Sequence, residues 1–180
     1  MLRTELDLDT AMPVWVLPGA RAKAGRDVTR PLTPSALSII HRRLDRSGGS
    51  PYVFASPVDP SRPITARAPS NAVRRAGQAG RLRSSTPAAD HNGAAASERL
   101  DLWREAGFRP HDLRRTCRTY LAKLGVSETV AKKILGHAPA RSDVTASVYD
   151  QHSYLPEMRA ALESWELRLL RIVAEHGGAT

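Results

Sequence analysis

Two short apolar runs separated by turn-forming residues stand near the start of the chain. Val14–Pro18 contains β-branched and aromatic side chains that favour a strand, and Val28–Leu32 reads as a second short strand. Gly19 and Gly25 lie between the runs and supply the backbone freedom that a reversal of the chain requires. The pattern therefore predicts a β-hairpin with Lys23 near its tip.

A helical spacing follows the hairpin. Thr33 suits the N-cap and Pro34 suits the first helical position, where a missing N–H costs no hydrogen bond. The helix is expected to end at the turn Ser47–Gly49. Its apolar face consists of Leu37, Ile40 and Leu44.

The middle of the chain has weaker patterns. Residues 51–57 (PYVFASP) predict a short buried or edge strand, and residues 71–79 predict a weak helix with a basic face. Residues 79–99 are rich in Gly, Ala, Ser and Pro and show little periodicity. We therefore expect a flexible loop there.

The last third of the chain predicts three amphipathic helices. The first runs from Pro110 to Gly125, the second is capped by Ser127 and ends at Gly136, and the third covers residues 156–175. Together with the hairpin they give an α+β fold class, mostly α-helical with a small antiparallel sheet. The side chains expected to face inward are Leu113, Cys117, Tyr120, Leu121 and Leu124, then Val130, Ala131, Ile134 and Leu135, then Met158, Leu162, Trp165, Leu169 and Ile172.

Composition narrows the class of protein. The 180 residues, 41% of them hydrophobic, fit one domain with its own core, and no apolar run is long enough to cross a membrane. The single cysteine, Cys117, excludes an internal disulfide, and no signal peptide is recognisable, so we expect a cytoplasmic protein. With 27 basic against 18 acidic residues, the net charge of +9 favours nucleic acid as a partner.

Five polar residues form a candidate catalytic set. His111 lies three residues before Arg114 in PHDLRRT, although six histidines in this arginine-rich chain give roughly 0.8 such matches by chance. Lys23 on the hairpin, His137 in ILGHAP and Tyr149 in VYDQHSYL extend the pair. In order and spacing the set resembles the tyrosine recombinase (phage integrase) family. That family's catalytic domain carries a lysine hairpin, an H-x-x-R helix, an L-G-H turn and a nucleophilic tyrosine.

The resemblance implies site-specific recombination or integration of double-stranded DNA. Tyr149 would attack a phosphodiester and stay bound to the 3′ phosphate, Arg114 would clamp the nonbridging oxygens, and Lys23 would protonate the departing 5′ oxygen. His111 and His137 would hydrogen-bond the phosphate or assist proton transfer. A tyrosine with a pKa near 10 needs such charges around it at pH 7, and a guanidinium binds phosphate oxygens in pairs.

The resemblance also bears on cofactors and partners. The chemistry needs no metal, ATP or other cofactor, and the sequence has no zinc-ligand spacing. The final helix is expected either to dock on a neighbouring protomer on DNA or to close its own core. The protein would be of bacterial or phage origin and associated with the nucleoid. Contacts with the DNA backbone are expected from Arg115, Lys132, Lys133, Arg81 and Arg83.

Several of these residues also have ordinary structural interpretations. His111 could cap its helix, His137 could interact with a helix dipole, and Lys23 could simply be solvated. Tyr154 competes with Tyr149 for the role of nucleophile, but we expect it to pack against the final helix. The acidic run ELDLD, residues 5–9, alternates with apolar residues and is interpreted as a solvated face.

One part of the family pattern is missing. The family's first catalytic arginine, in a T-G-x-R-x-x-E type segment before the lysine hairpin, has no counterpart in the 180 residues. Neither has its separate N-terminal DNA-clamping domain. We therefore expect residues 1–180 to form a single, incomplete catalytic domain, from a truncated gene, a mis-set start codon or a remnant. It would be weak or inactive alone, because one lost donor of this kind costs on the order of 10²–10³ in rate elsewhere.

Two other functions stay open. The segment YLAKLGVSETVAKKILGH also resembles a helix-turn-helix, with Thr129, Lys132 and Lys133 facing a DNA groove. Such a protein would bind DNA without chemistry, as a repressor or as a competitor of a full-length recombinase. A relaxing type IB topoisomerase would share the phosphotyrosine chemistry. The DNA target sequence and the direction of recombination have no readable pattern.

Overall fold

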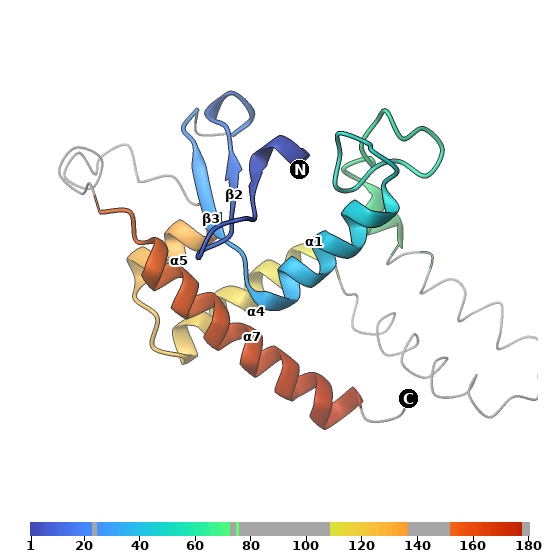
Figure 1. Cartoon of the computed structure of the whole chain (residues 1–180). Helices are drawn as coiled ribbons and strands as arrows, with labels where there is room; N and C mark the ends of the chain where they lie inside the picture. The colour runs from blue at the N-terminus through green and yellow to red at the C-terminus, as the bar shows by residue number, and fades with distance from the viewer. Residues whose placement is uncertain (23–24, 73–74, 76–108, 137–151, 178–180) are drawn as a thin grey trace, which may run out of the picture. The chain divides into compact units, whose positions relative to one another are not determined.

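The computed structural model describes residues 1–22, 25–72, 75, 109–136 and 152–177 (Figure 1). The chain forms two compact units. The larger unit comprises Met1–Pro63 and Cys117–Thr180, and the smaller comprises Ile64–Thr116. In the smaller unit, residues 68–72 and 75 are helical, so the weak helix predicted at residues 71–79 begins three residues earlier. The remainder of that prediction and the loop predicted at residues 79–99 lie outside the described residues.

The predicted hairpin is confirmed as part of a small antiparallel sheet. Strands β2 (Val14–Leu17) and β3 (Val28–Pro31) pair along their whole length, with Trp15 opposite Arg30. A further strand, β1 (Leu6–Asp7), pairs with the other edge of β2 and gives the order β1-β2-β3. The short 3-10 helices η1 (Arg3–Glu5) and η2 (Gly19–Arg21) precede β1 and follow β2.

Helix α1 (Pro34–Arg46) begins at the predicted cap, but the capping group comes from far along the chain. Thr33 is the N-cap and Pro34 the first helical residue. The carboxylate of Glu166 accepts hydrogen bonds from the Thr33 hydroxyl (2.6 Å) and the Ser35 amide (2.8 Å). Burial alone would raise the pKa of Glu166, but the hydrogen bonds from Thr33 and Ser35 outweigh it, so this pKa lies below its ordinary value of 4.5.

The C-terminal end of α1 is also held by a distant side chain. Arg3 donates through Nε to the Ser50 carbonyl (2.7 Å) and through a terminal nitrogen to the Leu44 carbonyl (2.9 Å). A cation at this end of a helix is favourable, because the last carbonyls have no helical partner and carry partial negative charge. Arg3 therefore ties the start of the chain to α1.

The strand predicted at residues 51–57 is wrong. This segment makes isolated bridges only, between Leu2 and Tyr52 and between Ala55 and Pro63. Val53 is fully buried and its amide bonds to the Met1 carbonyl, so the apolar content was correctly interpreted as core. The prolines on both sides cannot donate to a ladder, which prevents a regular strand.

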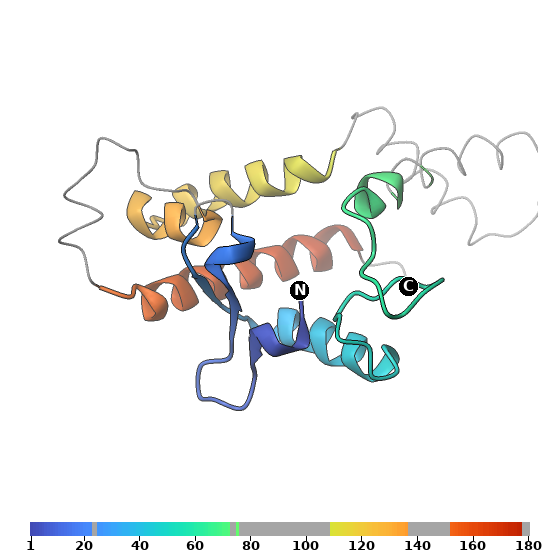
Figure 2. The same ribbon diagram turned by 90° about the horizontal axis from the view of Figure 1, so that it is seen from above.

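Three helices complete the larger unit with bounds close to those predicted. They are α4 (Pro110–Lys123), whose first half belongs to the smaller unit, α5 (Glu128–Leu135) and α7 (Leu155–Gly177). Figure 1 shows α5 and β3 beside the N-terminal part of α7, and both contact that helix. In Figure 2, α7 lies between the end of α4 and α1. This agrees with the contact between the tilted rings of Tyr120 and Trp165 and with the bonds of Glu166 to the start of α1.

Two apolar clusters hold the larger unit together. The first joins the end of α4 to α5 and α7. The second joins α1 to the sheet and to the segment around Val53. The buried members of the first are Leu121, Val130, Ala131, Ile134, Met158 and Ala161, and those of the second are Leu32, Ile40 and Val53. The α+β fold class, mostly helical with a small antiparallel sheet, is confirmed.

Three residues predicted to face inward are exposed instead. Leu113 is 62% exposed, Leu124 40% and Leu169 43%. Leu113 lies in the first half of α4, which belongs to the smaller unit, whereas α4 contributes Cys117 and Leu121 to the first cluster. The contacts of α7 with the first cluster end at Trp165, and the next residue, Glu166, bonds to α1, so Leu169 lies beyond the cluster, whereas Ile172 is half-buried.

Candidate active site

Helix α4 carries the first two candidate residues. Pro110 is its first residue, and the Arg109 amide donates a 2.9 Å hydrogen bond to Asp112 in the first turn. His111 and Arg114 are three residues apart, so they project from neighbouring turns on the same side of the helix. Both side chains are exposed. Two side chains that bind the same phosphate must lie on one side of the helix and be exposed, and this pair meets both conditions.

Arg115, predicted to contact the DNA backbone, also lies on the exposed surface of α4. Its guanidinium is 3.6 Å from the Asp112 carboxylate. An exposed pair of this kind contributes little to stability, so the guanidinium can exchange its carboxylate partner for a phosphate. The DNA contact itself stays a prediction.

Helix α5 leads directly to the predicted L-G-H turn. Ser127 accepts a hydrogen bond from the Val130 amide, and all four residues predicted to face inward from this helix are buried. Gly136 ends the helix with φ +65°, the left-handed conformation that favours glycine. The capping and stop signals are therefore confirmed. His137 is the next residue and lies outside the described residues.

Strand β3 contacts the same end of α5 through Arg30. Its Nε donates a 3.0 Å hydrogen bond to the Ile134 carbonyl, and its guanidinium carbon lies 5.5 Å from the centroid of the Trp15 ring. A Cβ atom added to Gly136 would collide with a terminal nitrogen of Arg30. The end of α5 is thus held against the sheet.

The hairpin turn is closed tightly at its base. The Gly19 amide donates a 2.7 Å hydrogen bond to the Asp27 carboxylate. A Cβ added to Gly19 would lie 2.7 Å from the Gly25 carbonyl oxygen, so only glycine fits where the two sides of the turn meet. Lys23 belongs to this turn in sequence but lies outside the described residues.

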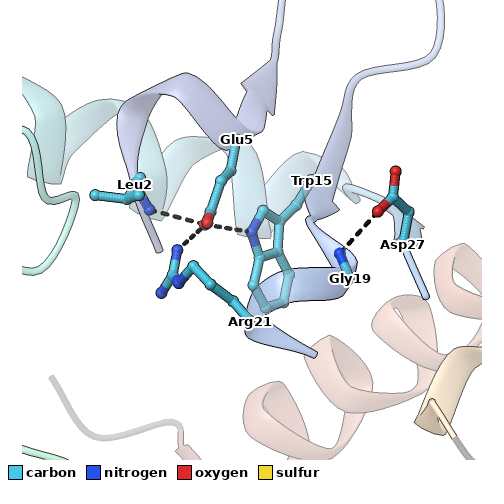
Figure 3. Close-up of polar contacts among 6 residues, drawn as sticks. All are labelled: Leu2, Glu5, Trp15, Gly19, Arg21 and Asp27. Atoms are coloured by element: carbon cyan, nitrogen blue, oxygen red, sulfur yellow. Dashed lines mark hydrogen bonds and ion pairs between the residues drawn. The ribbon is translucent and has the colours of Figure 1, made fainter. Parts of the chain in front are cut away.

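A buried carboxylate holds the first part of the turn through Arg21 (Figure 3). Glu5 accepts hydrogen bonds from the Leu2 amide (2.9 Å) and the Trp15 indole (3.1 Å), and it forms an ion pair with Arg21. Its side chain is only 2% exposed. The prediction that residues 5–9 form a solvated face is therefore wrong for Glu5, because its three donors replace water. Asp7 and Asp9 are exposed as expected.

The two lysines predicted to bind DNA differ in their surroundings. Lys132 is exposed and forms a 3.1 Å ion pair with Glu128 one turn earlier. The hydrogen bond and charge of Lys132 lower the pKa of Glu128. Lys133 is half-buried, and its ammonium lies 4.5 Å from the centre of the Tyr154 ring. Lys133 thus has a packing role that the sequence did not reveal.

The segment before α7 is held in an uncommon backbone conformation. Tyr154 has φ +54°, which is rare for a residue other than glycine. It packs against the first cluster, as predicted, and the His152 ring meets its edge at a centroid distance of 4.5 Å. His152 also bonds to Glu157 at 2.7 Å, and this bond lowers the pKa of Glu157.

The structure thus describes two of the five predicted catalytic residues, His111 and Arg114, and places them on one face of α4. The other candidates lie outside the described residues, and the convergence of all five on one phosphate stays a prediction. These undescribed candidates are Lys23, His137 and Tyr149 of the catalytic set and Arg81 and Arg83 of the DNA-binding set.

Three supporting residues were missed by sequence reasoning, namely Glu5, Arg30 and Glu166. Arg30 and Glu166 bond to partners more than 100 positions away, whereas Glu5 bonds to the nearby Leu2 amide as well as to Trp15 and Arg21. Arg30 also had a signal near it in the sequence. It stands in a short strand directly opposite a tryptophan once the hairpin register is fixed.

The described part of the chain contains no metal-ligand cluster and no helix that could cross a membrane. Within it, no group of three or more His, Cys, Asp and Glu side chains is placed to hold a metal ion. None of the described helices combines the length and the apolar character of a membrane span.

Comparison with known proteins identifies the family. Residues 2–154 match the phage integrase family. The prophage integrase IntA of Escherichia coli strain K12 is 27% identical to this chain over 159 residues, which are 88% of this chain. The chain spans about a third of the length of that relative, since the match covers 32% of it. No solved structure matches the chain significantly. On the family match, the chain belongs to the phage integrase family.

Proposed function

We propose that this chain acts in site-specific DNA recombination or integration, by breaking and rejoining DNA strands through a 3′-phosphotyrosine intermediate. The observation that carries the proposal is the exposed pair of His111 and Arg114 on one face of α4, in a chain of the phage integrase family. Double-stranded DNA is the proposed substrate, and the net charge of +9 favours its binding.

The residues divide the chemistry among them. Tyr149 is the proposed nucleophile: its oxygen bonds to the phosphorus, the bond to the 5′ oxygen breaks, and Lys23 supplies the proton to that oxygen. Arg114 stabilises the charge on the nonbridging oxygens in the transition state. His111 and His137 hydrogen-bond the phosphate or carry the tyrosine proton. Attack by a 5′ hydroxyl on the phosphotyrosine then rejoins the strand.

The 180 residues alone are proposed to cleave DNA weakly or not at all. The resemblance calls for a second guanidinium from a T-G-x-R-x-x-E type segment, and the sequence contains no such segment. With Arg114 as the one predicted phosphate clamp, the transition state loses a donor, which costs on the order of 10²–10³ in rate in comparable sites.

A second candidate function is DNA binding without chemistry. It is favoured by the geometry of α4 and α5, which are joined by a tight turn at Gly125 (φ +75°) and the Ser127 cap. Thr129 and Lys132 are exposed on α5, as a recognition helix would require. The burial of Lys133 against Tyr154 counts against this reading.

Assembly on DNA is proposed to involve α7. The C-terminal half of this helix exposes Leu167 (66%), Leu170 (50%) and Val173 (55%), which a neighbouring protomer could cover. The proposed place of action is the cytoplasm, on nucleoid DNA.

The test is the formation of a covalent adduct with DNA. Two proteins are incubated with a pool of nicked duplexes of randomised sequence, in which cleavage releases a short strand and traps the enzyme. One is the 180-residue chain. The other, called the extended chain, carries in front of it the part of IntA that precedes the matched region. The extended chain should form an adduct that resists denaturation, and Tyr149→Phe should abolish it. An adduct that survives Tyr149→Phe, or none with either protein, refutes the proposal, and sequence-selective binding without an adduct favours the second candidate.

A further inference from the structure

Arg30 is held in a fixed position on the sheet. The register of β2 and β3 places it directly opposite Trp15, so both side chains lie on the same face. Its guanidinium carbon is 5.5 Å from the indole centroid, within the range of a cation–π contact. The indole is itself fixed by its 3.1 Å hydrogen bond to the buried Glu5. The long arginine side chain is therefore ordered along its length.

From this position Arg30 binds the exposed end of α5. The last carbonyls of a helix have no N–H partner within the helix and carry partial negative charge. Arg30 Nε donates to one of them, the Ile134 carbonyl, at 3.0 Å. A charged donor makes this a stronger bond than a neutral one. It joins residues 104 positions apart in the chain.

The same guanidinium lies against Gly136. A terminal nitrogen of Arg30 occupies the space that a Cβ at this position would need. Gly136 is already left-handed, and its amide bonds to the Lys133 carbonyl at 3.0 Å. Arg30 therefore fixes both the last turn of α5 and the residue at which the chain leaves it. His137 is the next residue in the sequence.

We propose that Arg30 is a positioning residue that holds the end of α5 so that the chain leaves it in the direction His137 needs to reach the scissile phosphate. The inference rests on the proposed function, in which His137 contacts that phosphate. A misplacement of about 1 Å can cost on the order of 100-fold in rate, so a backbone anchor one residue away has kinetic consequences. Arg30 acts through His137 and makes no contact with DNA in this role.

The test uses Arg30→Met, which keeps an apolar stem on Trp15 but removes the donor. Arg42→Met, on the exposed surface of α1, is the control for the loss of one positive charge. In the 180-residue chain, hydrogen–deuterium exchange at the Gly136 amide, which bonds to the Lys133 carbonyl, should rise about ten-fold in Arg30→Met and stay unchanged in Arg42→Met. An unchanged exchange rate at this amide in Arg30→Met would show that Arg30 does not hold the end of α5.

The second measurement is the single-turnover rate of adduct formation by the extended chain. Arg30→Met should lower this rate about ten-fold at saturating DNA while the DNA dissociation constant stays within about two-fold. In a His137→Gln background, Arg30→Met should have no further effect, because the residue it positions is gone. If Arg30→Met lowers the rate of adduct formation equally with His137 and with Gln at position 137, Arg30 does not act through His137. The proposed function would not be affected by that result. If the parent protein forms no adduct, the proposed function fails, and the exchange measurement alone decides whether Arg30 anchors α5.

Discussion

Removal of the Glu5 carboxylate should destabilise the larger unit more than any other acidic substitution near the start of the chain. Glu5→Ala leaves the Leu2 amide and the Trp15 indole without their acceptor, in a place where the side chain of Glu5 is only 2% exposed. A buried donor left without an acceptor costs roughly 1–3 kcal/mol, and the low end applies to each of these two because both bonds are only part-buried. The side chain of Arg21 is 44% exposed and can bond to water instead, so the loss of its ion pair with Glu5 adds little to the cost. Glu5→Ala should therefore lower the free energy of unfolding by about 2–3 kcal/mol.

Urea denaturation followed by circular dichroism measures this loss. With a slope of about 2 kcal/mol per molar urea, the midpoint of Glu5→Ala should fall by roughly 1 M. Asp7→Ala is the matched control, because Asp7 is exposed on the adjacent strand, and its midpoint should move by less than about 0.3 M. Glu5→Gln should fall in between, because the Leu2 and Trp15 donors share one oxygen of Glu5 that an amide oxygen can replace, whereas the ion pair with Arg21 is lost. Equal midpoints for Glu5→Ala and Asp7→Ala would refute the assignment of Glu5 as a buried, fully bonded carboxylate.

Three further substitutions, two of them with a matched control, test other parts of the structure by the same measurement. Because the pKa of Glu166 is depressed, its carboxylate contributes stability at neutral pH that is lost as the pH falls below 4.5 and through the folded-state pKa. Glu166→Gln should therefore lower the free energy of unfolding by less at pH 3.5 than at pH 7. An equal loss of stability at both pH values would contradict this. Gly136→Ala should cost more than Gly125→Ala, because both glycines have positive φ but only Gly136 has a side chain in the space of its Cβ. Leu121→Ala should cost about 2–5 kcal/mol, since Leu121 is fully buried, whereas the exposed Leu113→Ala should cost less than about 0.5 kcal/mol.

Local chemistry made the element boundaries predictable. The Ser127 cap, the Gly136 stop and the Thr33–Pro34 start each depend on a few neighbouring residues, and all three were read correctly from the sequence. The hairpin followed from composition in the same way. The strand predicted at residues 51–57 does not form, because Pro51 and Pro57 cannot donate to a ladder and the segment makes isolated bridges only.

Contacts between distant segments were beyond local reasoning. Glu166 bonds to residues more than 130 positions earlier, and Arg30 bonds to a carbonyl 104 positions later. Glu5 reads as one acid among several in an exposed run, and only the folded chain brings three donors to it. Polar side chains that bond to other segments of the folded chain are therefore the class that sequence patterns miss in the described residues.

The candidate catalytic residues were found by their order along the chain and by family resemblance. The structure adds that His111 and Arg114 share one exposed face of α4. It also adds a set of contacts that fix the base of the Lys23 turn and the end of α5 before His137. The helical spacing of His111 and Arg114 was enough to predict their shared face. The contacts at the base of the turn and at the end of α5 depend on packing between distant segments.

The central claim is that Tyr149 becomes joined to the 3′ phosphate of a cleaved DNA strand. The most direct measurement is mass spectrometry of peptides from the DNA adduct of the extended chain after nuclease and protease digestion. The account predicts a nucleotide attached at Tyr149, and no such peptide from Tyr149→Phe. A nucleotide attached at Tyr154 or at any other residue would contradict it.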